Sequence, residues 1–129
     1  KLYAVGGMNA GYITSVERYD PALNAWEAVA PMATARHNHA VAVLDNKLYA
    51  AGGQDAADDD DMEDAPSNLV ERYDFERKAW EEVAPLAGVR LNHAVAALDG
   101  ELYAVGGESD GDVFTSVERY DPATNAWEA

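Results

Sequence analysis

The sequence predicts an all-β protein built from repeated antiparallel sheets, and three observations support this. Short segments return along the chain: "KLYAVGG" at 1–7 reappears as "KLYAAGG" at 47–53 and as "ELYAVGG" at 101–107. Turn residues separate the apolar runs, and Asp99-Gly100 is the strongest type of short hairpin signal. No segment of helical length shows the apolar period of about 3.6 residues that marks an amphipathic helix.

Each repeat is expected to contain four short strands, A to D. Strand A is "HAVAVLD" (39–45), which alternates in polarity and ends in a two-residue turn before strand B, "KLYAAGG". Strand C is typified by "SVERYDP" (15–21), where Asp-Pro closes the strand and opens a turn. Strand D is typified by "AWEAVAP" (25–31), which again stops at a proline. Successive strands therefore pair as an antiparallel sheet.

The spacing within the repeats is nearly constant, except in one connection. The tryptophan follows the tyrosine by seven residues in each copy, as in Tyr19 and Trp26. The distance from the second glycine to the tyrosine differs between copies: 12 residues from Gly7 to Tyr19, 20 from Gly53 to Tyr73 and 13 from Gly107 to Tyr120. The copies therefore differ in length mainly in the B–C connection, and in the second copy this connection contains an acidic stretch at 54–68.

Four-stranded units of about this length, each with paired glycines, a tyrosine and a spaced tryptophan, resemble kelch repeats. The resemblance implies β-propeller blades of four antiparallel strands, in a partial propeller of about three blades. We expect a blade lacking its first strand at 1–36, a complete blade at 37–90 with the acidic B–C insertion, and a blade with a truncated last strand at 91–129. Closed propellers normally need about four to eight blades. We therefore expect part of a longer kelch protein or, alternatively, two copies sharing one ring.

Three sets of repeated residues are assigned structural roles. Paired glycines allow close approach and backbone conformations closed to other residues, and they lack the lysine and helix of a phosphate-binding loop. The aromatic residues are expected to fill the space between blades. The positions are Gly6, Gly7, Gly52, Gly53, Gly106, Gly107, Tyr19, Tyr73, Tyr120, Trp26, Trp80 and Trp127.

A partner-binding face is predicted where the B–C loops and the D–A segments emerge together, since antiparallel alternation places them on one side. The resemblance implies this face too, because kelch adaptors of cullin-type ubiquitin ligases bind substrate peptides there, some through arginines in the D–A segments. The candidate residues are Arg36, His37, Arg90, Asp58, Asp59, Asp60, Asp61, Glu63 and Asp64. A structural role for both arginines stays open. The acidic stretch is either a solvated insertion or an electrostatic lip that attracts a basic partner.

Composition limits the other classes of function. The formal net charge of −15 disfavours nucleic acid and anionic membranes. The absence of cysteine excludes a disulfide scaffold, a thiol nucleophile and the Cys-Tyr centre of kelch-type copper oxidases, and it fits a cytoplasmic protein. No apolar run approaches the roughly 20 residues of a membrane span.

Metal binding and catalysis are not expected. His37 and His39 lie two apart, which on one strand face could hold a metal, but the second copy has Leu91 in place of His37. We therefore expect no cofactor and a non-catalytic protein-recognition module. The alternatives are a structural or cytoskeletal scaffold, such as an actin-binding kelch protein, and a kelch-type enzyme such as a sugar-acid mutarotase.

Overall fold

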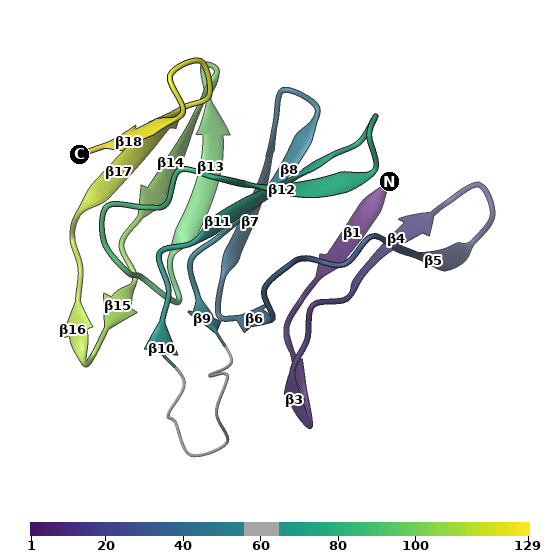
Figure 1. The fold of residues 1–129 in the computed structure, drawn as a ribbon, viewed down its shortest axis with the longest axis horizontal. Coiled ribbons are helices and arrows are strands. Elements are labelled where there is room, and N and C mark those ends of the chain that lie inside the picture. The colour runs from purple at the N-terminus through teal and green to yellow at the C-terminus, as the bar shows by residue number, and fades with distance from the viewer. Residues whose placement is uncertain (56–64) are drawn as a thin grey trace.

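The computed structural model describes residues 1–55 and 65–129, and it shows three twisted antiparallel sheets, or blades, standing side by side (Figure 1). The described residues contain no helix. Blade 1 has three strands in the order β1 (Leu2–Val5), β4 (Val16–Asp20), β5 (Ala25–Val29). Blade 2 has four strands: β7 (Ala40–Leu44), β8 (Lys47–Ala51), β11 (Val70–Asp74) and β12 (Ala79–Val83). Blade 3 also has four strands: β13 (Ala94–Leu98), β14 (Glu101–Val105), β17 (Val117–Asp121) and β18 (Ala126–Glu128).

Strands A to D are consecutive neighbours in blades 2 and 3, as the sequence predicts. The A–B hairpin of blade 2 turns at Asp45 and Asn46, whose φ angles of 49° and 60° are both left-handed. Blade 3 turns at Asp99 and Gly100, with φ angles of 51° and 81°. This conformation matches the twist of the flanking strands, and Asn, Asp and Gly adopt it at low cost. The local turn chemistry therefore sets the register of both hairpins.

The B–C connections, which the sequence analysis treats as loops, contain short strands. β2 (Met8–Asn9) pairs with β3 (Gly11–Tyr12), and β15 (Glu108–Ser109) pairs with β16 (Asp112–Val113). In blade 2, β9 (Gln54–Asp55) lies between β10 (Ala65–Pro66) and β6 (Arg36–His37). These strands point to the same side of the molecule, opposite the hairpin turns (Figure 1).

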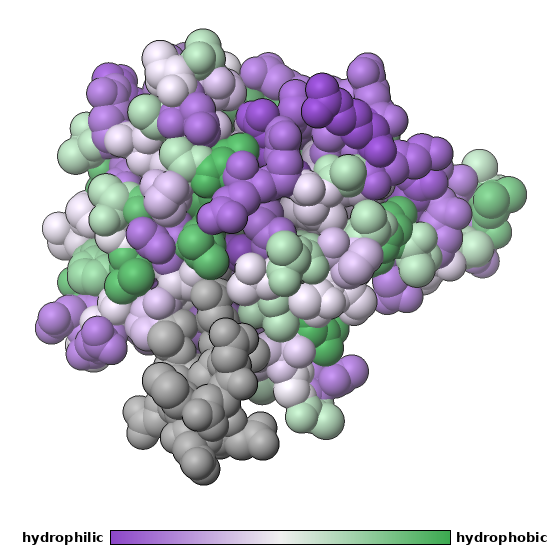
Figure 2. All heavy atoms as spheres, in the orientation of Figure 1, coloured by the Kyte–Doolittle hydropathy of each residue, from purple (hydrophilic) through white to green (hydrophobic). Residues whose placement is uncertain are grey.

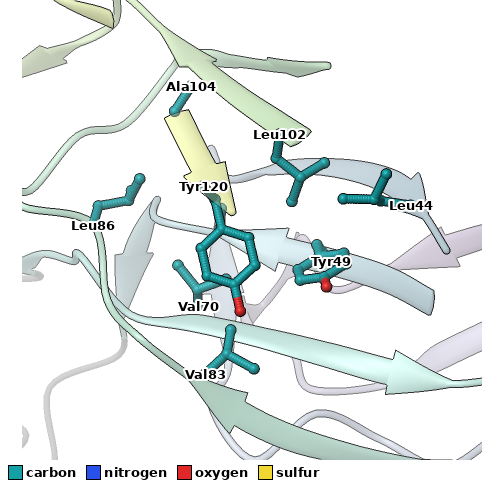
Figure 3. Close-up of a cluster of buried hydrophobic side chains, with 9 residues drawn as sticks. Leu44, Tyr49, Val70, Val83, Leu86, Leu102, Ala104 and Tyr120 are labelled. Atoms are coloured by element: carbon teal, nitrogen blue, oxygen red, sulfur yellow. The ribbon is translucent and has the colours of Figure 1, made fainter. Parts of the chain in front are cut away.

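The core lies between the blades rather than inside any one of them. Between blades 2 and 3, Tyr49 and Tyr120 meet edge to face with ring centroids 5.7 Å apart, and Leu102, Val70 and Leu86 pack around them (Figure 3). Removing one such side chain from water contributes about 1.5–3 kcal/mol. The first strands, β7 and β13, also lie side by side. Each blade thus depends on its neighbours to cover its apolar side chains.

Four of the six paired glycines, Gly6, Gly52, Gly53 and Gly107, lie against the backbone of a D–A segment. A Cβ atom at Gly52 (φ +68°) would lie 2.6 Å from the carbonyl oxygen of Arg90 in blade 3. A Cβ atom at Gly53 (φ +93°) would lie 2.5 Å from the carbonyl oxygen of His37. The amide of Gly53 also donates to the Arg90 carbonyl at 2.9 Å. Both the left-handed backbone and the close approach therefore require glycine here.

The repeated tryptophans connect each blade to the preceding one. The indole of Trp80 donates to the carbonyl oxygen of Ala30 at 2.7 Å, and that of Trp127 donates to the carbonyl oxygen of Ala84 at 2.9 Å. Trp26 occupies the same repeat position in blade 1 but is 49% exposed. Trp80 and Trp127 are therefore each held against the blade that comes before them in the chain.

Candidate partner-binding face

The D–A segments and the B–C loops are joined by backbone pairing on one face. β6 of the first D–A segment pairs with β9, so that Arg36 lies opposite Asp55 and His37 opposite Gln54. In blade 3, Leu91 and Glu108 form the equivalent bridge, with hydrogen bonds of 3.0 and 2.9 Å between their backbones. Each of the two D–A segments is therefore held against the B–C loop of the blade that it enters.

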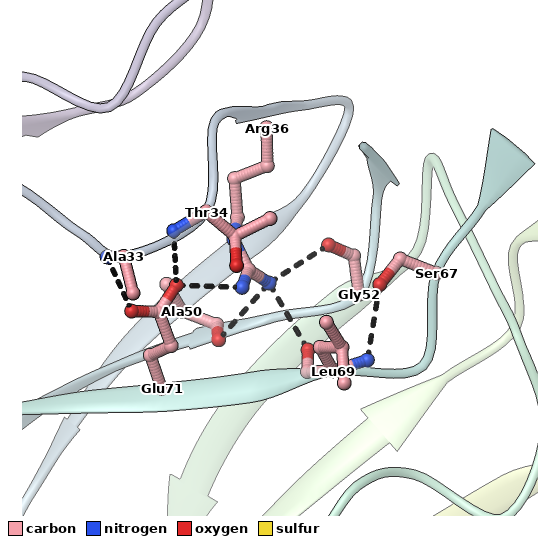
Figure 4. A network of polar contacts seen from close by, with 8 residues as sticks. All are labelled: Ala33, Thr34, Arg36, Ala50, Gly52, Ser67, Leu69 and Glu71. Atoms are coloured by element: carbon pink, nitrogen blue, oxygen red, sulfur yellow. Dashed lines mark hydrogen bonds and ion pairs between the residues drawn. The ribbon is translucent and has the colours of Figure 1, made fainter. Parts of the chain in front are cut away.

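A buried arginine lies beneath this pairing in blade 2 (Figure 4). Arg36 is completely buried, and its Nη2 lies 2.8 Å from Oε2 of Glu71, which is also buried. Its Nη1 donates to the carbonyl oxygens of Gly52 at 3.1 Å and Leu69 at 3.0 Å. The guanidinium thus binds strands B and C together and neutralises the carboxylate between them.

Glu71 completes this cluster from its other side. Its carboxylate accepts hydrogen bonds from the backbone amides of Ala33, at 2.8 Å, and Thr34, at 3.3 Å. These amides belong to the D–A segment, so the Arg36–Glu71 pair positions the segment that leads to the candidate face. Removing either member of the pair would leave the other charge buried without its partner, which is strongly destabilising.

Blade 3 repeats the arrangement. Arg90 pairs with Glu118 at 2.9 Å and donates to the carbonyl oxygens of Gly106 at 2.8 Å and Ser116 at 3.1 Å. The amide of Ala87 donates to the Glu118 carboxylate. Burial therefore removes the guanidinium groups of Arg36 and Arg90 from the accessible part of the candidate face. The structure favours the structural alternative for both arginines, because their donors are directed at the blade itself.

The two histidines proposed to share a strand face do not do so. Asn38, between His37 and His39, has a left-handed φ of 55° and ends β6. That prediction was wrong because a left-handed residue breaks the alternation of a strand. The His37 ring instead lies 4.0 Å from the ring of Tyr12, between centroids. Among residues 1–55 and 65–129, no cluster of three His, Asp or Glu side chains is arranged to hold a metal ion.

His39 and His93 lie inward from the face, at the contacts between blades. Burial lowers the pKa of both to about 4, and the nearby Arg36 and Arg90, respectively, add to the effect. His93 packs against Gly52 of blade 2, and His39 packs against Gly6 of blade 1. Both imidazoles are therefore neutral near pH 7 and fill space at the blade contacts.

Two asparagines that the sequence analysis did not single out are exposed on this face. Asn38 precedes the partly buried His39 and Asn92 precedes the buried His93, and both asparagines have left-handed φ angles, of 55° and 53°. The backbone amide of Asn92 donates to the backbone carbonyl oxygen of Asn38 at 2.9 Å, and this hydrogen bond links neighbouring blades. The Asn38 side chain donates to Oε1 of Gln54 at 3.2 Å. The repeated "NH" dipeptide was the available signal, since asparagine tolerates left-handed backbone.

The acidic candidates Asp58, Asp59, Asp60, Asp61, Glu63 and Asp64 lie outside the described residues. The residues on either side of them, in β9 and β10, pair with each other, and β9 pairs with β6. The two described strands that flank these residues, β9 and β10, therefore lie next to His37 and on the same face as Asn38.

The family of the chain follows from its repeats. The family model described as "Kelch motif" matches residues 1–33, 35–87 and 90–129. The chain belongs to the kelch-repeat family. The all-β kelch fold predicted from the sequence is thus confirmed, and the match supports a kelch-repeat module for interaction with proteins.

Several kelch-like proteins are similar to this kelch-repeat chain. Kelch-like protein 36 of Rattus norvegicus is 37% identical over 102 residues, which cover 79% of this chain and 16% of that protein. Kelch-like protein 34 of Homo sapiens is 35% identical over 132 residues, covering 98% of this chain and 20% of that protein. The kelch repeats described here thus span about a fifth of the length of these relatives. No helix in the described part of the chain is long and apolar enough to cross a membrane.

Proposed function

We propose that this kelch-repeat chain is a non-catalytic recognition module that binds a protein segment on the face formed by its B–C loops and D–A segments. The observation that carries the proposal is the pairing of each D–A segment with a B–C loop above a buried Arg–Glu cluster. A rigid base with exposed connections above it is the usual arrangement of a binding surface. By its resemblance to the adaptors of cullin-type ubiquitin ligases, the bound protein would be a ligase substrate.

The polar groups on this face suit an extended peptide. The side-chain amides of Asn38 and Asn92 can both donate and accept, which matches the alternating groups of a peptide backbone. His37 is partly exposed beside them. The buried arginines act as positioning residues, because they hold the D–A segments without reaching the partner.

The acidic stretch at 54–68 favours a partner with lysine or arginine near the bound segment. The seven acidic residues of the 54–68 stretch supply −7 of the formal net charge of −15. A concentrated negative charge beside a binding surface raises the association rate of basic partners, and salt weakens the effect. The cytoplasmic location remains a prediction from composition.

A peptide-display selection on the immobilised chain, followed by kinetic measurements on the selected peptide, tests this function. We expect Asn92→Ala to weaken binding by roughly tenfold, since a lost hydrogen-bonding partner in a recognition site costs about 1–2 kcal/mol. Glu76→Ala is the control, because Glu76 is exposed in a turn on the opposite side of the blade. Binding that depends on Glu76 but not on Asn92 would contradict the proposed face.

The role of the acidic stretch is tested separately with a variant in which six of its seven negative charges are removed. The variant replaces the acidic candidates by their amides: Asp58, Asp59, Asp60, Asp61 and Asp64 by Asn, and Glu63 by Gln. We expect slower association with a basic selected peptide at low salt, little change at high salt, and an unchanged dissociation rate. An equal loss at both salt concentrations would show that the acids do not act by long-range attraction.

A further inference from the structure

A row of polar side chains crosses the candidate face from blade 2 to blade 3. Its centre is the pair Asn38 and Asn92, and the backbone hydrogen bond between them, at 2.9 Å, fixes their spacing. Nδ2 of Asn38 donates to Oε1 of Gln54 at 3.2 Å, and Nδ2 of Asn92 donates to Oε1 of Glu108 at 3.5 Å. We call these four side chains the polar row. Because two D–A segments and two B–C loops contribute to it, the pairing of those segments with those loops holds the row in place.

The hydrogen bonds within the polar row determine which atoms it offers to a partner. The carboxylate of Glu108 can only accept, so Asn92 must turn its amino group toward it. This orientation leaves Oδ1 of Asn92 as an acceptor, and no donor among residues 1–55 and 65–129 is hydrogen-bonded to it. The exposed blade 3 end of the row therefore presents a carboxylate and an amide oxygen side by side, and both groups accept hydrogen bonds.

The surroundings of Glu108 are negative, and the face offers no accessible lysine or arginine to neutralise them. Glu108 and Asp110 are both exposed on the same loop, and Figure 2 shows hydrophilic side chains around β16, at the lower left. The D–A segments and B–C loops contain no lysine. Their two arginines, Arg36 and Arg90, are buried, and each is paired with a glutamate of strand C. The face therefore favours a partner that brings a positive charge to it.

The two ends of the polar row differ in charge. Gln54 and Glu108 each follow the paired glycines of strand B, so they occupy the same repeat position. The side-chain amide of Gln54 can both donate and accept, whereas the carboxylate of Glu108 accepts only and is negative. A partner segment that lies along the row thus meets a neutral end at blade 2 and an anionic end at blade 3, and this asymmetry favours one direction of binding.

We propose that the blade 3 end of the polar row binds an arginine side chain of the partner, with the guanidinium donating to the Glu108 carboxylate and to Oδ1 of Asn92. This inference rests on the proposed function, because the arginine belongs to the protein segment bound on that face. A guanidinium carries several N–H donors in a planar fork and no acceptor, so it can satisfy two neighbouring acceptors at once. A lysine ammonium supplies the charge without this directed geometry. Glu108 is therefore the specificity-determining residue of the face.

Peptides selected by display on the immobilised chain test the proposal when their dissociation constants are measured. We expect the selected peptides to share an arginine. Replacing that arginine by citrulline, which keeps the shape of the side chain but removes its charge, should weaken binding by roughly tenfold, as expected for the loss of a charge-assisted hydrogen bond. Lysine in its place should also weaken binding. Glu108→Gln, which gives blade 3 the residue type that blade 2 has at Gln54, should weaken binding of the arginine peptide by about the same factor.

A double-mutant cycle shows whether Glu108 contacts the arginine. In Glu108→Gln the citrulline replacement should cost little further affinity, because the interaction that it removes is already absent. Asp112→Asn is the matched control, since Asp112 is an exposed acidic residue of the same loop but lies outside the polar row. In this variant the citrulline replacement should still cost the full factor. Glu108 and Asp112 are both exposed, so chemical denaturation of either variant should match that of the parent protein.

Three results would overturn this inference, and they separate it from the proposed function. Peptides that depend on Asn92 but show no preference for arginine over lysine, or that bind Glu108→Gln equally well, refute the arginine site and leave the proposed recognition face standing. Equal coupling of the arginine to Glu108 and to Asp112 shows long-range attraction rather than a contact. Peptides whose binding does not depend on Asn92 refute the arginine site and the proposed face together.

Discussion

Replacing Arg36 by alanine should destabilise the protein strongly. The change removes an ion pair at 2.8 Å and donors to the carbonyl oxygens of Gly52 and Leu69, all in a completely buried position. It leaves the buried carboxylate of Glu71 without its positive partner. Breaking a buried pair in this way typically costs about 3–5 kcal/mol. We expect the lower part of that range, because Glu71 keeps the amides of Ala33 and Thr34.

Chemical denaturation measures this loss, and two further variants show its cause. Arg36→Ala combined with Glu71→Gln removes the unpaired charge, so it should recover about 1 kcal/mol or more relative to Arg36→Ala alone. Arg18→Ala is the control, since Arg18 forms the same type of Arg–Glu pair with Glu27, but in solvent. Exposed pairs contribute little to stability, so this variant should unfold close to the parent protein.

The binding assay decides between the two roles considered for Arg36. A framework residue loses stability when it is removed, whereas a residue that contacts the partner loses affinity with little change in stability. If Arg36→Ala unfolds at the same denaturant concentration as Arg18→Ala, our account of the buried cluster is wrong. A loss of peptide affinity at unchanged stability would restore Arg36 to the set of binding residues.

The other predictions concern the packing of the D–A segments and the contacts between blades. Gly53→Val should destabilise the protein severely, because a Cβ atom there would lie 2.5 Å from a backbone oxygen. Thermal or chemical unfolding measures the loss, and a change in unfolding free energy within about 0.5 kcal/mol, as at ordinary surface sites, would refute the packing. Trp80→Ala should cost about 3 kcal/mol and Trp26→Ala far less, so equal losses would contradict the docking of Trp80 on blade 1. Stability should fall as the pH is lowered from about 6.5 to about 4. His39 and His93 have pKa values of about 4 in the folded protein and 6.5 in the unfolded chain. Between these values the unfolded chain binds more protons than the folded protein, and this favours unfolding. Denaturation of the double variant His39→Gln, His93→Gln should show a weaker dependence in this interval, and an unchanged dependence would assign it to other groups.

The strands and their turns could be predicted from the sequence because they depend on neighbouring residues. Asp45-Asn46 and Asp99-Gly100 favour left-handed backbone, and this sets both A–B hairpins without help from the rest of the chain. Strict repetition then extended the assignment to all three blades. The short pairs in the B–C loops were missed because two-residue strands carry no periodic signal.

Tertiary structure decided which side chains can act. The neighbours of Arg36 in the sequence do not reveal that it is buried, because Glu71 and Leu69 enclose it from strand C, more than 30 residues away. Trp26 and Trp80 lie in nearly identical segments, yet the indole of Trp80 donates to a backbone carbonyl of blade 1, whereas Trp26 is 49% exposed. Local sequence determines the conformation of a strand, but burial depends on which distant surface covers it, and that differs between copies of the same repeat.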